Sequence, residues 1–319
     1  MDSTLKDILV PIDFKAPSMN ALEYAINLAK RTNGRIYLLY VIEAGGILED
    51  LFVSVDEIVK VTEKVKEKLQ ALANQLQDTH HMMVLTRIER GRPSKKILEV
   101  AEELKPRFII LGENHQGDDT PQVLGATVEQ VTLNSPVPVI TTKGNYKDFG
   151  SQMVVPLDLT KETRRQLVSS IAYAKNYNTK ICLVSALIGG IIFTESRIYR
   201  KLKHARHVLT ENKIEACMKL FPRTKVPPYK RVLEFADEMN ADLILVMTHQ
   251  EGFTFDNYIG AFAHHIINES KIPVLSLTAS ASSQSYGEIL KDLLDPLGVL
   301  APKTIRQQPL KRLFRKNRK

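Results

Sequence analysis

The stretch that decides the fold is Ile8-Leu9-Val10-Pro11-Ile12-Asp13, because it returns in the second half of the chain as Met153-Val154-Val155-Pro156-Leu157-Asp158. The two aspartates are 145 residues apart (158 − 13 = 145). The apolar run at 36–41 returns at 181–186 with the same offset. Self-similarity at a fixed separation is typical of an internal duplication, and 319 residues are enough for two domains of about 100–200 residues each.

Each copy alternates short apolar runs with segments of helical period. The first helix is expected to follow Ser18, a good N-cap residue, and a third strand of the second copy alternates over 214–220. In the first copy we expect strands at residues 8–13, 35–42, 82–88, 108–112 and 137–140. The pattern predicts an α/β fold of two tandem, doubly wound, Rossmann-like parallel-sheet domains, each with five strands and four helices.

Composition along the chain sets the expected boundaries. The polar stretch at 142–151 carries two glycines and is a natural linker between the copies. After Leu277 a serine-rich stretch leads into a short amphipathic segment and then a basic end. We therefore expect a first domain at 1–143, a linker at 144–152, a second domain at 153–278, and an appended helix with a basic, disordered tail at 279–319.

Composition also favours a globular, cytoplasmic protein. Apolar residues make up 44% of the chain, no run approaches the ~20 residues of a membrane span, and the first thirteen residues lack the apolar core of a secretion signal. The two cysteines, Cys182 and Cys217, lie in apolar, strand-like runs. Two residues are too few for a disulfide framework or a cysteine zinc site, so we expect buried free thiols.

The net charge of +8 lies at one end of the chain. From Ala301 onward there are eight basic residues and no acidic one, so residues 1–300 are formally neutral and the domains themselves do not point to a polyanion partner. Two interpretations of the tail stay open. It contacts an anionic surface, either a membrane or RNA, or it is a solvated extension with no partner.

In an open, doubly wound sheet, ligands bind beyond the carboxyl ends of the strands where the strand order reverses. In the first copy those ends carry Asp13, Val41 and Gly112. Here the sequence resembles the universal stress protein family, in which the first strand ends in an aspartate and the fourth runs into G-x-x-G, nine residues, then G-[ST]. The stretches that carry the resemblance include Val10-Pro11-Ile12-Asp13-Phe14, Ile109-Ile110-Leu111-Gly112, Gly125-Ala126-Thr127-Val128 and Ser135-Pro136-Val137-Pro138-Val139.

The resemblance implies an adenine nucleotide alpha hydrolase-like fold and a regulatory, stress-response protein in place of a conventional enzyme. It implies ATP or AMP as the ligand, held in the first copy by Pro11, Asp13, Val41, Gly112, Gly125 and Thr127. The phosphate loop is eroded, because His115 stands at the second glycine and Ala126 at the hydroxyl position.

The second copy departs further from the family pattern. The equivalent site positions there are Pro156, Asp158, Ala186 and Gly260. The other motif positions are taken by Met247, Gln250 and Ala261. We therefore expect the second site to be degenerate.

Three alternatives remain open. Asp13 either binds ribose hydroxyls, as the resemblance implies, or caps the following helix and its loop. The chain either binds a nucleotide or is a nucleotide-free interaction module. Slow ATP hydrolysis is a third alternative, although no lysine or arginine can be assigned to it from spacing. We expect no metal, because the pairs His80-His81 and His264-His265 lack a third ligand.

The first expected partners are the two copies themselves. The resemblance implies that the last strands of the domains, 137–140 and 274–277, pair within one chain to form an intramolecular pseudo-dimer. A homodimer and an unknown regulatory protein partner are the other expectations.

Overall fold

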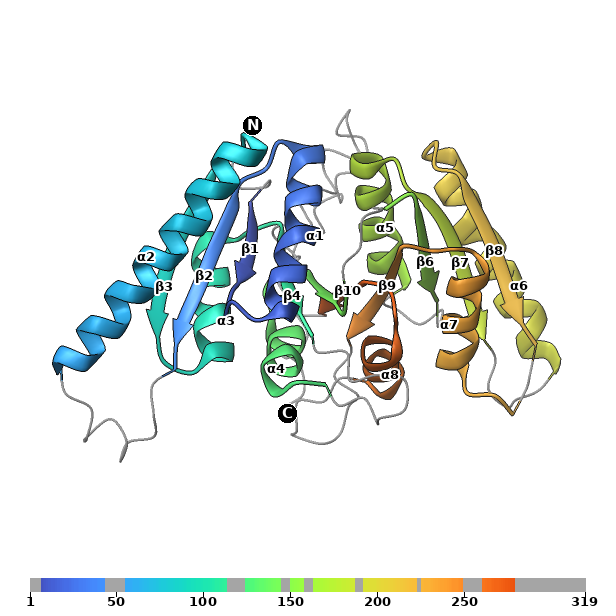
Figure 1. Cartoon of the computed structure of the whole chain (residues 1–319). Helices are drawn as coiled ribbons and strands as arrows, with labels where there is room; N and C mark the ends of the chain where they lie inside the picture. The colour runs from blue at the N-terminus through green and yellow to red at the C-terminus, as the bar shows by residue number, and fades with distance from the viewer. Residues whose placement is uncertain are drawn as a thin grey trace, which may run out of the picture. The chain divides into compact units, whose positions relative to one another are not determined.

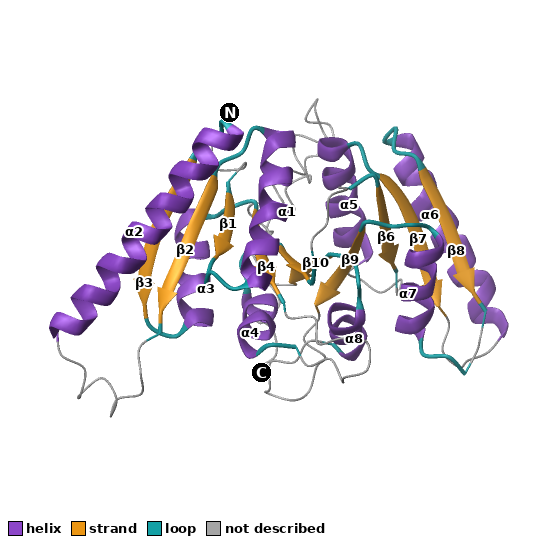
Figure 2. Ribbon diagram, viewed as in Figure 1, coloured by secondary structure: helices purple, strands orange, loops and turns teal. Residues whose placement is uncertain are grey.

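The computed structural model describes residues 7–43, 55–113, 124–144, 150–157, 163–186, 192–222, 225–248 and 260–278. The chain divides into a compact unit, Met1–Ser282, and a second unit, Ser283–Lys319. The expected appended helix and basic tail therefore lie outside the described residues. Within the described part of the first unit, ten strands and eight helices alternate along the chain (Figures 1 and 2).

The first copy follows the predicted order of strands and helices. Its elements are β1 (Ile8–Pro11), α1 (Ala16–Thr32), β2 (Ile36–Ile42), α2 (Val55–His80), β3 (Val84–Arg90), α3 (Pro93–Leu104), β4 (Phe108–Gly112), α4 (Ala126–Asn134) and β5 (Val139–Thr142).

The second copy repeats this order. Its elements are β6 (Gln152–Pro156), α5 (Thr163–Tyr177), β7 (Lys180–Ala186), α6 (Ile192–Glu211), β8 (Ala216–Phe221), α7 (Pro228–Glu238), β9 (Leu243–Thr248), α8 (Ala261–Glu269) and β10 (Val274–Thr278). All strand pairs within a copy are parallel. The predicted fold class is confirmed.

The strands of both copies form one sheet, in the order β3-β2-β1-β4-β5-β10-β9-β6-β7-β8. The sheet is continuous because β5 and β10 pair in antiparallel fashion, with Leu275 opposite Ile140 and Val274 opposite Thr141. This confirms the expected pairing between the last strands. Strand order reverses beside β1 in the first copy and beside β6 in the second, so each copy has its own switch point.

The sheet is buried because helices cover it, and its strands read as continuous apolar runs. Ile8, Leu9 and Val10 of β1 are each at most 1% exposed, and every residue of β9 is buried. Because helices cover both faces of the sheet, side chains on both sides of a central strand are buried, and the central strands are therefore apolar without alternation.

Local expectations need correction at one helix and three strands. The strand expected at 8–13 ends at Pro11, and the strand expected at 82–88 runs from Val84 to Arg90. The first helix begins at Ala16, with Lys15 in the N-cap position, so Ser18 lies inside the first turn and is not the N-cap. Pro17 explains the earlier start, because its fixed φ suits the first turn of a helix. The strand expected at 137–140 runs instead from Val139 to Thr142, since the Ser135 hydroxyl bonds the backbone N–H and C=O of Val137 and holds a turn there.

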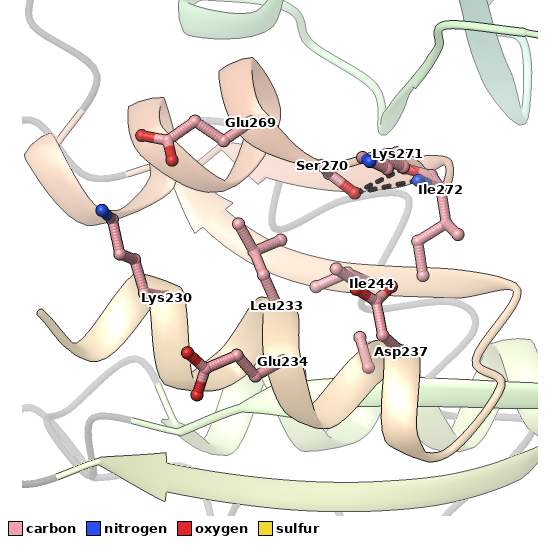
Figure 3. Close-up of a pocket in the computed structure, with 10 residues that line it drawn as sticks. Lys230, Leu233, Glu234, Asp237, Ile244, Glu269, Ser270, Lys271 and Ile272 are labelled. Atoms are coloured by element: carbon pink, nitrogen blue, oxygen red, sulfur yellow. Dashed lines mark hydrogen bonds between the residues drawn. The ribbon is translucent and has the colours of Figure 1, made fainter. Parts of the chain in front are cut away.

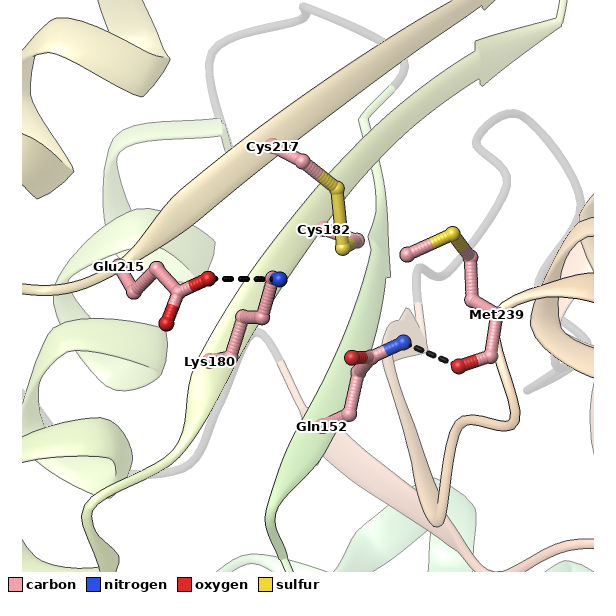
Figure 4. Close-up of a disulfide and its surroundings, with 6 residues drawn as sticks. All are labelled: Gln152, Lys180, Cys182, Glu215, Cys217 and Met239. Carbon is pink, nitrogen blue, oxygen red and sulfur yellow. Dashed lines mark hydrogen bonds and ion pairs between the residues drawn. A yellow bond between two sulfur atoms is a disulfide. The ribbon is translucent and has the colours of Figure 1, made fainter.

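The expectation of free thiols was wrong, because Cys182 and Cys217 form a disulfide (Figure 4). They are register partners on the neighbouring parallel strands β7 and β8, with Cα atoms 4.6 Å apart. Cys182 is fully buried. Neighbouring strands lie about 4.8 Å apart, so register alone brings the two residues together, and the cysteine count could not reveal that register.

The disulfide predicts a thiol count that depends on reduction. Protein denatured without reductant should show no free thiol, and reduction should release both cysteines. Because 35 residues separate the two cysteines, chain entropy predicts that reduction lowers the free energy of unfolding by about 3–4 kcal/mol. Thiol titration and urea unfolding with and without dithiothreitol measure both effects. A Cys182→Ser, Cys217→Ser variant should not respond to reductant, and two titratable thiols before reduction would contradict the pairing.

Candidate functional site

The switch point of the first copy lies beyond β1, where Asp13 follows the strand by two residues. One Asp13 oxygen, Oδ1, accepts hydrogen bonds from the Lys15 N–H at 3.0 Å and from the Ser18 hydroxyl at 2.6 Å. The other, Oδ2, lies 3.4 Å from the Lys15 ammonium, and the side chain is 51% exposed. Partial burial acts to raise the pKa of Asp13, but the hydrogen bonds from Ser18 and Lys15 outweigh it and lower the pKa. An exposed anion therefore stands at this crevice.

An aromatic surface that we did not anticipate from the sequence adjoins Asp13. Phe14 has a φ of +62°, an outlier for a bulky residue, and its ring centroid lies 5.5 Å from that of Tyr40 on β2. The ammonium of Lys68, from α2, lies 4.1 Å from the Phe14 ring centroid. Strained backbone of this kind persists where the surroundings fix it, and such sites are often functional. The sequence carried no spacing signal for Lys68, because α2 is long and mostly charged on its outer face.

The two predicted glycines serve different purposes. A Cβ at Gly112 would lie 1.9 Å from the carbonyl oxygen of Pro17, so only glycine lets α1 pack this closely on β4. Gly125 is the N-cap of α4, with φ −62°, and a Cβ there would meet no atom within 4 Å in the described part of the chain. Gly112 therefore has a packing role, whereas no such close contact among the described residues requires glycine at 125.

The remaining predicted residues of the first copy lie at the same edge of the sheet. Pro11 ends β1, Val41 is the next-to-last residue of β2, and Thr127 lies in the first turn of α4. Parallel strands end at a common edge, so β1, β2, β4 and the start of α4 bring the six residues to one side. His115 of the eroded loop lies outside the described residues.

A buried ion pair follows the ends of β4 and β5. Glu113 lies 3.9 Å from the ammonium of Lys143 (Oε2 to Nζ), and both side chains are at most 7% exposed. Burial raises the pKa of Glu113 to about 7, opposed by the Lys143 charge and by a hydrogen bond from the backbone N–H of Gly125. Lys143 also donates to the carbonyl oxygen of Asn268 in α8 of the second copy. Sequence reasoning missed the pair, although a charged residue directly after each buried strand was a usable signal.

The switch point of the second copy is filled differently. Pro156 ends β6, Ala186 ends β7 and Gly260 is the N-cap of α8, whereas Asp158 lies outside the described residues. The buried side chain of Gln166 donates to the carbonyl oxygens of Pro156 at 2.8 Å and Leu245 at 3.3 Å, across β6 and β9. Met247 stands in place of Gly112. Gln166 thus fills the interface between α5 and the sheet, and the expectation of a degenerate second site stays a prediction.

A separate pocket of about 260 Å³ lies between α7 and the chain that follows α8 (Figure 3). Leu233, Ile244 and Ile272 give it an apolar lining, and Lys230 and Glu234 add charges. It adjoins the amino ends of β9 and β10, opposite the carboxyl edge that carries the predicted site. The pocket contains none of the predicted site residues.

The described residues contain no group of three or more His, Cys, Asp or Glu side chains that could hold a metal ion. His265 instead bonds Glu269 through Nδ1 at 2.9 Å and stacks on Tyr229 at a ring distance of 4.2 Å. No helix in the described ranges is long and apolar enough to cross a membrane.

A model of the Universal stress protein family matches residues 4–143 and 151–277, which is most of the chain and covers both copies. The chain belongs to the universal stress protein family. Two universal stress proteins of Methanocaldococcus jannaschii are similar to it. One is 26% identical over 151 residues, covering 46% of this chain and 87% of the relative. The other is 28% identical over 159 residues, covering 45% of this chain and 98% of the relative.

Solved structures show the same fold over both copies. A universal stress protein from Archaeoglobus fulgidus superposes with a TM-score of 0.72 at 21% identity, covering 87% of this chain and 99% of its own. One from Pseudomonas aeruginosa gives a TM-score of 0.62 at 16% identity, covering 92% and 100%. The fold of this chain therefore occurs in other universal stress proteins.

The contrast between the two glycines of this universal stress protein is testable by alanine substitution. Gly112→Ala should lower the free energy of unfolding by about 2–3 kcal/mol, because its Cβ meets the Pro17 backbone 1.9 Å away. Gly125→Ala should cost less than about 1 kcal/mol, since space is available and alanine is only a poorer N-cap. Urea unfolding of both variants makes the measurement. Equal losses would show that the α1–β4 contact does not require glycine.

The buried pair of this universal stress protein predicts a pH dependence of stability. The folded pKa of Glu113, about 7, lies above the ordinary glutamate value of 4.5, so the folded state binds the proton more tightly. The stabilisation is complete below the unfolded pKa and is lost as the pH rises through 7. We expect a loss on the order of 2–3 kcal/mol in the native chain relative to a Glu113→Thr, Lys143→Thr variant. Urea unfolding of both proteins from pH 4.5 to 8 measures this loss. If the free energies of unfolding of the native chain and of the variant change with pH in parallel, the prediction is contradicted.

Proposed function

We propose that the first copy binds an adenine nucleotide and that the chain is a cytoplasmic regulatory protein of the stress response. Family membership supports the class of protein. The observation that supports a nucleotide ligand is the exposed, anionic Asp13 at the switch point, beside the aromatic surface of Phe14 and Tyr40.

The chemistry of these groups suits a nucleotide. A carboxylate at this position accepts hydrogen bonds from ribose hydroxyls, and aromatic rings stack on bases. The start of α4, with Gly125 and Thr127, offers backbone N–H groups and the positive end of a helix dipole to a phosphate. A universal stress protein from Archaeoglobus fulgidus has been solved in complex with dAMP, but its TM-score of 0.33 to this chain is too low to place a ligand here.

The second candidate function is a nucleotide-free interaction module. It is favoured by the bonding of Asp13 Oδ1, which already accepts hydrogen bonds from the Lys15 N–H and the Ser18 hydroxyl. In that case the protein would act through a second copy of itself or a regulatory partner, and the basic tail would supply a contact with an anionic surface.

We propose no conventional enzymatic activity. Phosphate transfer requires charge stabilisation on the γ-phosphate, and no lysine or arginine can be assigned to that role from spacing. Three lysines of the first copy that lie near the carboxyl edge already have partners. Lys15 is paired with Asp13, Lys68 lies over Phe14, and Lys143 is paired with Glu113 and Asn268.

The ligand proposal predicts a difference between the two aspartates. Asp13→Asn should weaken AMP and ATP binding about tenfold, because the amide is a poorer acceptor for ribose hydroxyls, while Asp158→Asn should leave both affinities unchanged. Equilibrium dialysis at millimolar ligand decides between the candidates. Absence of binding by the native chain would support the interaction module, and equal affinities in all three proteins would place the ligand elsewhere.

A further inference from the structure

The N-terminus of α4 already holds an internal carboxyl group. The first N–H groups of a helix have no partner within it, and the helix dipole makes this end a favoured seat for phosphate. Here the carboxylate of Glu113 accepts a hydrogen bond from the Gly125 N–H. The Glu113 side chain is 5% exposed, and among the described residues Oε2 has no hydrogen-bond partner. Because burial raises the pKa of Glu113 to about 7, it places a negative charge beside the groups that a phosphate would use once the pH is above 7.

The counter-charge is tied to the other copy. Lys143 lies 3.9 Å from Glu113 and donates to the Asn268 carbonyl in the last turn of α8. A cation is stabilised at this end of a helix, because the carbonyl groups there point outward. With both contacts in place, the ammonium is engaged by Glu113 and by α8.

The pair is specific to the first copy. In register, Gly112 pairs with Thr142 and its counterpart Met247 pairs with Leu277, so the positions that follow are Glu113 and Lys143 in one copy and Thr248 and Thr278 in the other.

The second copy shows that these positions pack without charges. The Thr278 hydroxyl donates to the Ser135 carbonyl at 2.8 Å, and the Thr248 hydroxyl donates to Leu277 at 3.3 Å. Both threonines are buried. The fold does not require charges here, so the charged pair calls for another explanation than packing.

We propose, on the basis of the proposed function, that Glu113 determines which adenine ligands the first copy binds, because its carboxylate occupies the anion-binding position at the N-terminus of α4. Each phosphate added to a ligand brings negative charge toward a buried carboxylate, where repulsion is poorly screened. The first copy then favours adenine ligands with the least phosphate charge, with adenosine bound best, AMP next and ATP least.

The test is calorimetric titration of adenosine, AMP and ATP into the native chain, Glu113→Gln and the Glu113→Thr, Lys143→Thr variant at pH 8. The double variant carries the residues of the second copy, which keeps the test interpretable if the single variant folds poorly. We expect ATP affinity to rise at least tenfold in both variants and adenosine affinity to change less than threefold. Circular dichroism and thermal unfolding confirm that each variant is folded.

The outcomes separate this inference from the proposed function. If the native chain binds ATP as tightly as the variants do, the first copy still binds nucleotide but Glu113 does not select against phosphate, and the inference is overturned. If the native chain does not bind ATP and the variants do, the inference is supported in its strongest form. If no protein binds any of the three ligands, both the proposed function and this inference fail.

Discussion

The antiparallel pairing of β5 with β10 is the interaction on which the rest of the structure depends. Both strands are buried along their whole length, so an unpaired β5 or β10 would expose a row of backbone donors and acceptors. Side chains reinforce the junction in both directions. Lys143 reaches the last turn of α8, and Thr278 reaches Ser135 at the end of α4. The duplicated sequence therefore supplies both partners of a contact that a single domain would need a second chain to complete.

Joining the copies in one chain removes the requirement that they be identical. In the first copy the crevice keeps an exposed carboxylate at Asp13 and a glycine at 112 that brings α1 close to β4. In the second, the Gln166 amide binds two strand carbonyls and a methionine replaces the glycine. The two copies therefore differ in side chains within one fold, with Gly112 and Met247 at equivalent positions. We interpret the first copy as the ligand-binding half and the second as its structural partner.

Elements defined by periodicity along the chain were predictable from the sequence, and contacts that depend on register were not. The repeat and the order of strands and helices along each copy follow from the apolar runs. The pairing of the last strands follows from the family resemblance. The Cys182–Cys217 bond arises only when β7 and β8 align, and no spacing rule fixes that alignment. The Glu113–Lys143 pair also depends on the alignment of β4 and β5, although a charged residue directly after each strand was a signal for it. Ser18 was misassigned because Pro17 starts the helix earlier, which places the hydroxyl against Asp13.

The central claim is that the two copies share a fold but only the first retains a ligand site. Native mass spectrometry of the full chain with AMP tests it most directly, because it counts bound ligands without assuming where they lie. The account predicts one AMP per chain at saturation and no second addition at higher concentration. Two bound AMP molecules per chain, lost independently in Asp13→Asn and Asp158→Asn variants, would contradict it, as would a chain that binds none.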